Sequence, residues 1–251
     1  MASWSQRRKL LYGGTTAVIL ATAIFLPVFF YFHKTPTCFD GRKNGNETGI
    51  DCGGSCTRLC PSAFLAPSVA WTRLERVAPD LYNVATYIVN PNPNAGARAV
   101  PYHVIIYDRA GVEITEYGGI VTLPPRRNTL AFDGAISVGN RIPAKASFAF
   151  GGIPDWTAET DPLAAVSVGD KKYSEDASSA SLSVYLNDNS ANSISRTDVY
   201  AVLYDKDGNA IGFSKTILDG IPAYGSATAP FTWPLSFNGA VISIEVLPAA
   251  E

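Results

Sequence analysis

The sequence predicts a mainly β protein, in which two tandem immunoglobulin-like β-sandwiches follow one transmembrane α-helix and a small disulfide-rich module. Three observations predict this. A charge-free apolar run lies near the N-terminus, all four cysteines fall within 23 residues, and the remainder alternates apolar and polar residues in short stretches. We expect five segments: a cytoplasmic N-terminus at 1–10, a transmembrane helix at 11–32, a cysteine-rich module at 33–63, and sandwiches at 64–157 and 158–251.

The apolar run is 22 residues long, from Leu11 to Phe32. At about 1.5 Å per residue, a helix of this length spans a hydrocarbon core of roughly 30 Å. The basic residues Arg7, Arg8 and Lys9 precede it, which predicts a cytoplasmic N-terminus and an extracytoplasmic C-terminal region. We expect residues 11–32 to contact the lipid bilayer of the cell membrane, as a single-pass anchor.

A cleaved signal peptide is the competing interpretation. Its apolar region would be shorter, and a small-x-small cleavage site would follow it. The motif at 21–23 has that form but lies inside the run, with Ile24, Phe25 and Leu26 after it. The pattern favours an uncleaved anchor.

The cysteine-rich module holds Cys38, Cys52, Cys56 and Cys60, and no cysteine follows. An even number of cysteines outside the membrane predicts two disulfides, and the spacing leaves all three pairings open. A zinc site is an alternative, although structural zinc usually takes two closely spaced pairs of cysteines.

The same module offers oxygen ligands in a glycine-rich loop, so calcium is a second alternative. The candidate ligands are Asp40, Asn44, Asn46, Glu47 and Asp51. No D-x-D-x-D-G core is present, and a metal-free module without cofactor is the favoured interpretation.

The pattern C-x-D-G-x-x-N-G-x-E-x-G-x-D-C-G-G-x-C over Cys38–Cys56 resembles a short cysteine-rich module of surface and secreted proteins. The resemblance implies a position beside an anchor and an ectodomain, and it implies no activity.

Residues 64–251 contain one pattern twice. A shift of 97 positions places eight residues of 90–125 on identical residues, including Tyr107, Asp108 and Gly111 on Tyr204, Asp205 and Gly208. Short alternating stretches separated by Asn-rich and Asp-x-x-Gly turns predict strands and hairpins in both halves. We expect Gly151–Pro162 to be a flexible linker between independently folding sandwiches.

The stretches IIYD and VLYDKDG, each after an Asn-rich turn, resemble the FxLYD type of extracytoplasmic β-sandwich. The first half, with YNVATYIVNPNPNAG, is also similar to membrane-anchored envelope proteins of candidate-phylum bacteria. Both resemblances imply structural or binding modules without catalytic residues.

Residues that could carry chemistry are few. The nucleophile-elbow, P-loop and zinc-protease motifs do not occur. Asp205, Asp207 and Asn209 could hold a cation, but a hairpin turn explains them. The isolated basic pairs Arg126–Arg127 and Lys171–Lys172 indicate solvated loops. We expect His103 to face solvent or fill a gap on a strand. The tryptophans Trp71, Trp156 and Trp233 indicate core packing.

Residues 35–251 hold 16 basic and 22 acidic residues, which gives no electrostatic footprint for nucleic acid. The sequence therefore predicts a non-catalytic envelope protein that presents two sandwiches to an envelope protein or surface ligand. An accessory subunit of a secretion, pilus or cell-wall complex is the alternative, because small residues around Gly13 and Gly14 would let another helix approach.

Overall fold

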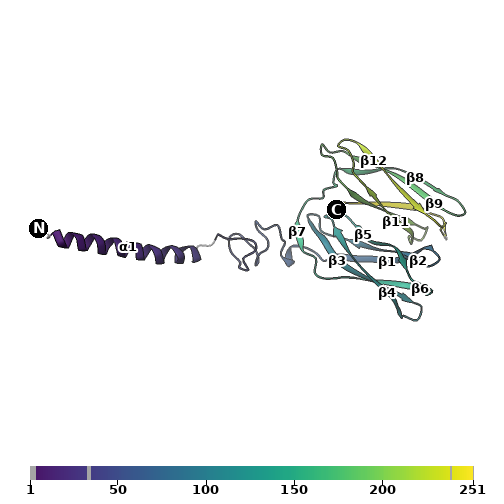
Figure 1. Cartoon of the computed structure of the whole chain (residues 1–251). Helices are drawn as coiled ribbons and strands as arrows, with labels where there is room; N and C mark the ends of the chain where they lie inside the picture. The colour runs from purple at the N-terminus through teal and green to yellow at the C-terminus, as the bar shows by residue number, and fades with distance from the viewer. Residues whose placement is uncertain (1–3, 33–34, 238, 251) are drawn as a thin grey trace. The chain divides into compact units, whose positions relative to one another are not determined.

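The computed structural model describes residues 4–32, 35–237 and 239–250 of the 251-residue chain (Figure 1). Two compact units divide at Ser55 and Cys56. The helix α1 (Trp4–Phe32) buries none of its side chains and is long and apolar enough to cross a membrane. The expected apolar run is helical, and the helix extends further towards the N-terminus than residue 11. His33 and Lys34 lie outside the described residues.

Three threonine hydroxyl groups of α1 are satisfied within the helix. Thr15, Thr16 and Thr22 each donate to the carbonyl four residues earlier, at 2.8–2.9 Å. These bonds reduce the cost of placing hydroxyls in an apolar medium. Pro27 lies inside the helix, which membrane helices tolerate.

The first sandwich contains two antiparallel sheets, ordered β1-β2-β5 and β4-β3-β6, with β7 pairing with β3. Its core takes side chains from both sheets, among them Val84, Ile88, Val104, Ile106 and Leu123. The strands are β1 (Ser68–Ala78), β2 (Leu81–Val89), β3 (Ala95–Asp108), β4 (Glu113–Leu123), β5 (Thr129–Ser137), β6 (Pro143–Phe150) and β7 (Trp156–Ala158).

The second sandwich has the sheets β12-β9-β8 and β11-β10-β13, which is the strand order of the first half without β7. Leu182, Val184, Leu203 and Phe231 are among its core residues. The strands are β8 (Val166–Glu175), β9 (Ala180–Asp188), β10 (Thr197–Tyr204), β11 (Ala210–Leu218), β12 (Ser226–Trp233) and β13 (Ser243–Ala250). The predicted mainly β fold of two sandwiches is confirmed.

The buried faces of the central strands align with a one-residue offset between the halves. Val84 and Ile88 face the first core as Leu182 and Leu186 face the second, which is a shift of 98 positions. The hairpins downstream keep the shift of 97. The buried residue directly after β2 is therefore Asn90, and the corresponding place is taken by Asp188, the last residue of β9.

The segment expected to be a linker is packed. Trp156 is 1% exposed and opens β7, so this strand of the first sandwich crosses the expected boundary at residue 157. Asp161 forms an ion pair with Arg127, and the Leu163 side chain is buried in the second core. The expectation of a flexible linker is wrong, because these contacts fix the segment to both halves.

A third apolar cluster joins the two sandwiches. We call it the junction, and it comprises Ala85, Tyr87, Leu130, Tyr200, Val202, Phe213 and Ala249. It lies between the sheet β1-β2-β5 and the sheet β11-β10-β13, which Figure 1 shows side by side. Each of these sheets is therefore covered on both faces. We infer that the two sandwiches unfold as one unit.

The hairpin glycines test this inference. Gly111 and Gly208 have φ values of +77° and +76°, and a Cβ at either position would meet no atom within 4 Å. Gly111→Val and Gly208→Val should each lower the free energy of unfolding by about 1–2 kcal/mol through backbone strain. Because the junction couples the halves, both changes should lower the same melting transition.

Gly152→Val is the matched control. Gly152 also faces open space but lacks a positive φ, so its replacement should leave the melting temperature near that of the wild type. Two transitions, each lowered by one hairpin variant only, would contradict the coupling.

Candidate functional site

The oxygen-bearing residues of the cysteine module brace their own loop. The Asp51 carboxylate accepts from the backbone amides of Asp40 and Gly41 at 2.9–3.1 Å. Asp40 accepts from the Asn44 side chain at 2.7 Å, and this bond holds the pKa of Asp40 below its usual range. These carboxylates are occupied by N–H donors within the loop.

Two further residues complete this bracing. Glu47 accepts from the Asn44 amide at 3.1 Å, and the Asn46 side chain accepts from the Ser55 amide and hydroxyl. A Cβ at Gly54 would lie 2.0 Å from the Asn46 carbonyl oxygen, so the close turn requires glycine. Calcium binding by these residues stays the alternative to the predicted metal-free module.

All four cysteines of the module are in disulfides, as predicted. The chain from Cys56 onward belongs to the second compact unit, so the expected boundary at residue 63 falls inside packed structure. Thr57 and Leu59 form backbone hydrogen bonds with β7 at 2.9 and 2.8 Å. The Phe64 ring stacks on Trp156, with the ring centroids 5.1 Å apart.

The Asn-rich turn of the first half holds the backbone of Leu65 in place. We call the pair Asn90 and Asn92 the clamp. Asn92 accepts from the Leu65 amide at 2.7 Å and donates to the Leu65 carbonyl at 2.8 Å. Asn90 accepts from Asn92 and donates to the carbonyls of Ala95 and Pro124. Both asparagines are 5% exposed. The sequence analysis identified a turn here but missed the clamp. The signal in the sequence is a pair of asparagines separated by one residue.

The clamp predicts a stability effect. Asn92→Ala should lower the free energy of unfolding by about 1–3 kcal/mol, because the amide and the carbonyl of Leu65 lose the two hydrogen bonds that the buried Asn92 side chain provides. Amide hydrogen exchange at Leu65 should accelerate as well. Asn94→Ala is the matched control, since Asn94 is an exposed asparagine of the same loop. Equal protection of Leu65 in both variants would contradict the clamp.

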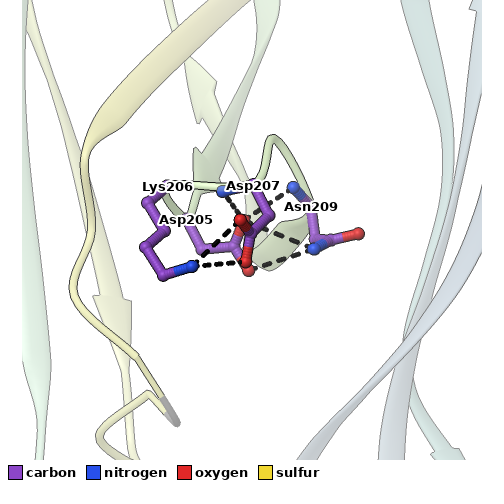
Figure 2. Close-up of polar contacts among 4 residues, drawn as sticks. All are labelled: Asp205, Lys206, Asp207 and Asn209. Atoms are coloured by element: carbon purple, nitrogen blue, oxygen red, sulfur yellow. Dashed lines mark hydrogen bonds and ion pairs between the residues drawn. The ribbon is translucent and has the colours of Figure 1, made fainter.

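The polar side chains of the second Asp-Gly turn bond to groups within the turn (Figure 2). The Asp205 carboxylate accepts from the amides of Asp207 and Asn209 at 2.9 and 2.8 Å, and this capping lowers its pKa. The Lys206 ammonium pairs with Asp207 at 2.9 Å. Asp108 caps the first-half turn in the same way, accepting from Ala110 and Val112. The predicted hairpin turns explain both aspartates.

The tryptophans lie in packed regions, as expected. Trp71 contacts Tyr87 and Phe213 at the junction, with ring centroids 5.5 and 6.3 Å apart. Trp233 is 2% exposed and donates from Nε1 to the Phe213 carbonyl at 3.3 Å. Trp71 therefore packs at the junction, and Trp233 belongs to the core of the second sandwich.

The other polar candidates are dispersed. His103 lies 3.2 Å from Glu116 on the neighbouring strand, and both side chains are half exposed. Lys171 and Lys172 lie in β8, where a loop was expected. The Lys171 ammonium donates to the Ile244 carbonyl at 2.7 Å. The structure therefore does not bring these residues together with His103 into one site.

The junction carries a polar network that sequence reasoning missed. The Glu245 carboxylate accepts from the Tyr87 hydroxyl at 2.8 Å and from the Tyr204 hydroxyl at 2.9 Å. Burial beside this carboxylate raises the pKa of Tyr87 to about 12 and raises the pKa of Tyr204. One glutamate of the second sandwich thus binds a tyrosine from each half.

A second carboxyl lies at the same junction. Glu75 of β1 is partly buried and accepts from the Phe213 amide at 3.5 Å. Burial raises the pKa of Glu75 to about 8. The junction thus has an apolar centre with hydrogen-bonded groups from both sandwiches around it, which suits a fixed structural interface.

The sequence matches no protein-family model and no curated protein. Among solved structures it is similar to latent PorU from Porphyromonas gingivalis, at 11% identity over 72% of this chain and 18% of that chain, with a TM-score of 0.24. Red sea bream transglutaminase gives 9% identity over 72% and 31%, with a TM-score of 0.21. A glycoside hydrolase family 2 beta-glucuronidase gives 12% over 87% and 29%, with a TM-score of 0.23. The chain spans less than a third of these structures, and the low scores carry no conclusion.

Proposed function

We propose that this chain is a non-catalytic protein of the cell envelope, anchored in the membrane by α1 and presenting two sandwiches as one body outside the cytoplasm. The observation that carries the proposal is the contrast between the two parts. The helix α1 exposes all its apolar side chains, whereas the β region has an acidic composition and a buried core in each half. An exposed apolar helix of this length needs a lipid environment.

The fixed junction supports a presenting role. Two sandwiches joined by a flexible linker would sample many orientations, whereas an interface with apolar and hydrogen-bonded contacts holds one. The described Asp and Glu side chains with altered pKa values cap turns or pack at the sandwich interface, which suits a structural protein. The matching strand order of the halves supports their origin as two copies of one FxLYD-type unit.

The test is a topology experiment in intact cells after wall removal. Protease should degrade the β region and spare an N-terminal tag, and the mature chain should retain α1. A protected C-terminal tag would contradict the orientation. Recovery of a mature form that begins near residue 24 would show that the helix is a signal peptide.

An accessory subunit is the second candidate function. A Cβ placed at Gly13 or Gly14 would meet no atom within 4 Å, so this face of α1 is open to another helix. Co-purification in mild detergent distinguishes the two roles. A stoichiometric membrane partner that is lost in a Gly13→Leu variant would favour the subunit, and its absence would favour the independent anchor.

A further inference from the structure

The central strands β2 and β9 lead into the same turn. In the first sandwich, the Asn90 side-chain oxygen accepts from the Asn92 amide at 3.0 Å. In the second, one carboxylate oxygen of Asp188 accepts from the Ser190 amide at 2.8 Å. The two pairs are 98 positions apart, which is also the shift between the buried faces of β2 and β9. The two turns are therefore equivalent.

The turns that face them are equivalent as well. The Arg126 amide donates to the Asn92 carbonyl at 2.9 Å, and the Tyr224 amide donates to the Ser190 carbonyl at 3.0 Å. Arg126 and Tyr224 have positive φ values, of +61° and +52°. These residues are again 98 positions apart. The two halves thus share this pair of turns in backbone conformation and in hydrogen bonding.

The two turn pairs differ in one buried side chain. The Asn90 side-chain nitrogen donates to the carbonyls of Ala95 and Pro124 at 2.9 and 2.8 Å. Because Asp188 makes the same bond through Oδ1, its Oδ2 atom takes the place of this nitrogen. Asp188 is 2% exposed, and Oδ2 has no hydrogen-bond partner among the described residues. An acceptor in the second half thus replaces a donor in the first.

A neighbouring strand pair locates the carbonyl groups of the second half. Ala97 pairs with Leu123 between β3 and β4, and Ile194 pairs with Ile221 in an isolated bridge. The two carbonyls that accept from the Asn90 side chain lie two residues before the first member of the pair and one residue after the second member. The same places in the second half are therefore next to its isolated bridge.

The carbonyl groups of Asn192 and Pro222 take these two places. The Ser190 hydroxyl donates to the Asn192 carbonyl at 2.9 Å, so a further oxygen lies nearby. Oδ2 of Asp188 therefore faces backbone carbonyls without the N–H groups that separate such oxygens in the first half. Burying an ionised carboxylate in this way is costly unless a positive charge neutralises it.

The oxygen atoms indicate the class of cation. Calcium binds carboxylate, carbonyl and hydroxyl oxygens in flexible geometry, whereas magnesium usually keeps several of its water molecules. Structural zinc takes nitrogen and sulfur ligands. Ser190 and Asn192 also line a cleft of about 450 Å³, which gives an ion access to this loop from solvent.

We propose that the Asp188 carboxylate and the carbonyl groups of Asn192 and Pro222 bind a calcium ion. The ion links the two turns of the second sandwich, as the Asn90 amide group links those of the first. With one carboxylate in the site, its Kd should be about 0.1–1 mM, the range of extracellular modules. The site goes beyond the proposed function and can fail while the proposed topology stands, because it lies within one sandwich.

The experiment measures thermal unfolding of the full chain in detergent micelles, in EGTA and in about 10 mM calcium chloride at constant ionic strength. Calcium should raise the wild-type melting temperature by about 4 °C. Asp188→Asn should lose this shift, because an asparagine side chain donates to the two carbonyls as Asn90 does. This variant should melt in EGTA no lower than the wild type. Asp51→Asn is the matched control and should keep the shift, since it removes a carboxylate from the other candidate calcium loop.

Amide hydrogen exchange in the wild type provides a second measurement that needs no variant. Calcium should slow exchange at the amides of Ser190 and Tyr224, which join the two turns of the proposed site. The equivalent amides of Asn92 and Arg126 in the first sandwich should exchange at the same rate with and without calcium.

Three results would overturn the proposal. An unchanged wild-type melting temperature in calcium would show that a proton or a water molecule occupies the place beside Asp188. An equal shift in magnesium chloride would contradict the choice of calcium. A shift that Asp51→Asn abolishes and Asp188→Asn retains would assign the ion to the cysteine module.

Discussion

Phe213→Ala is expected to destabilise both sandwiches together, by about 3–5 kcal/mol. Phe213 lies on β11, is 1% exposed, and belongs to the junction. Its ring contacts Trp71 and Phe132 of the other sandwich, with centroids 6.3 and 6.4 Å apart. Truncation would leave a cavity between the two sheets, and neither sandwich could close it alone.

The measurement is thermal unfolding of the full chain, followed by hydrogen exchange of amides in β2 and β9. Both strands should lose protection by a similar factor. Ile217→Ala is the matched control, because Ile217 lies on the same strand and is 43% exposed. Loss of protection in β9 alone would contradict a junction that stabilises both halves.

Glu75→Gln is expected to increase stability at alkaline pH and to flatten its pH dependence. The folded protein raises the pKa of Glu75 to about 8, above its ordinary value of 4.5. Between about pH 5 and pH 8 the folded state therefore retains a proton that the unfolded state has lost. The Glu75 contribution to stability is present below about pH 4.5 and is lost as the pH rises through 8.

The expected loss in the wild type is on the order of 5 kcal/mol over this pH range, because each pKa unit between 4.5 and about 8 corresponds to about 1.4 kcal/mol. Glutamine stays neutral and can still accept from the Phe213 amide, so the variant should lack this loss. Urea unfolding at pH 5, 7 and 9 measures the difference. Glu113→Gln, an exposed glutamate on β4, should behave as the wild type does. A wild type equally stable at pH 5 and pH 9 would contradict burial of the carboxyl.

The sequence predicted the elements that depend on local pattern. The apolar run lies in α1, and the alternating stretches around Tyr87 and Val184 are strands. The Asp-x-x-Gly turns are hairpins, because an aspartate cap and a positive-φ glycine are local requirements. The cysteine count predicted the disulfides without their pairing.

The junction depended on contacts between distant segments and was not predicted. A signal was nevertheless present in β10, where Val199–Leu203 is a continuous run of buried residues. Such a run is typical of a strand covered on both faces, whereas a half-buried strand alternates. β2 is also buried without alternation from Val84 to Ile88, although its small and polar members Ala85 and Thr86 obscured the pattern.

The Asn90–Asn92 clamp was missed for a different reason. An asparagine in a turn serves local backbone capping and long-range capping equally well, so composition does not separate the two. The bonds from Asn92 reach Leu65, which lies 27 positions earlier.

The central claim is that the two sandwiches form one body, and calorimetry of the full wild-type chain in detergent tests it most directly. The measured unfolding enthalpy of the β region should equal the van't Hoff enthalpy, since a single cooperative transition gives a ratio near one. A ratio near two, or two resolved transitions, would show that the sandwiches unfold separately and would contradict the account.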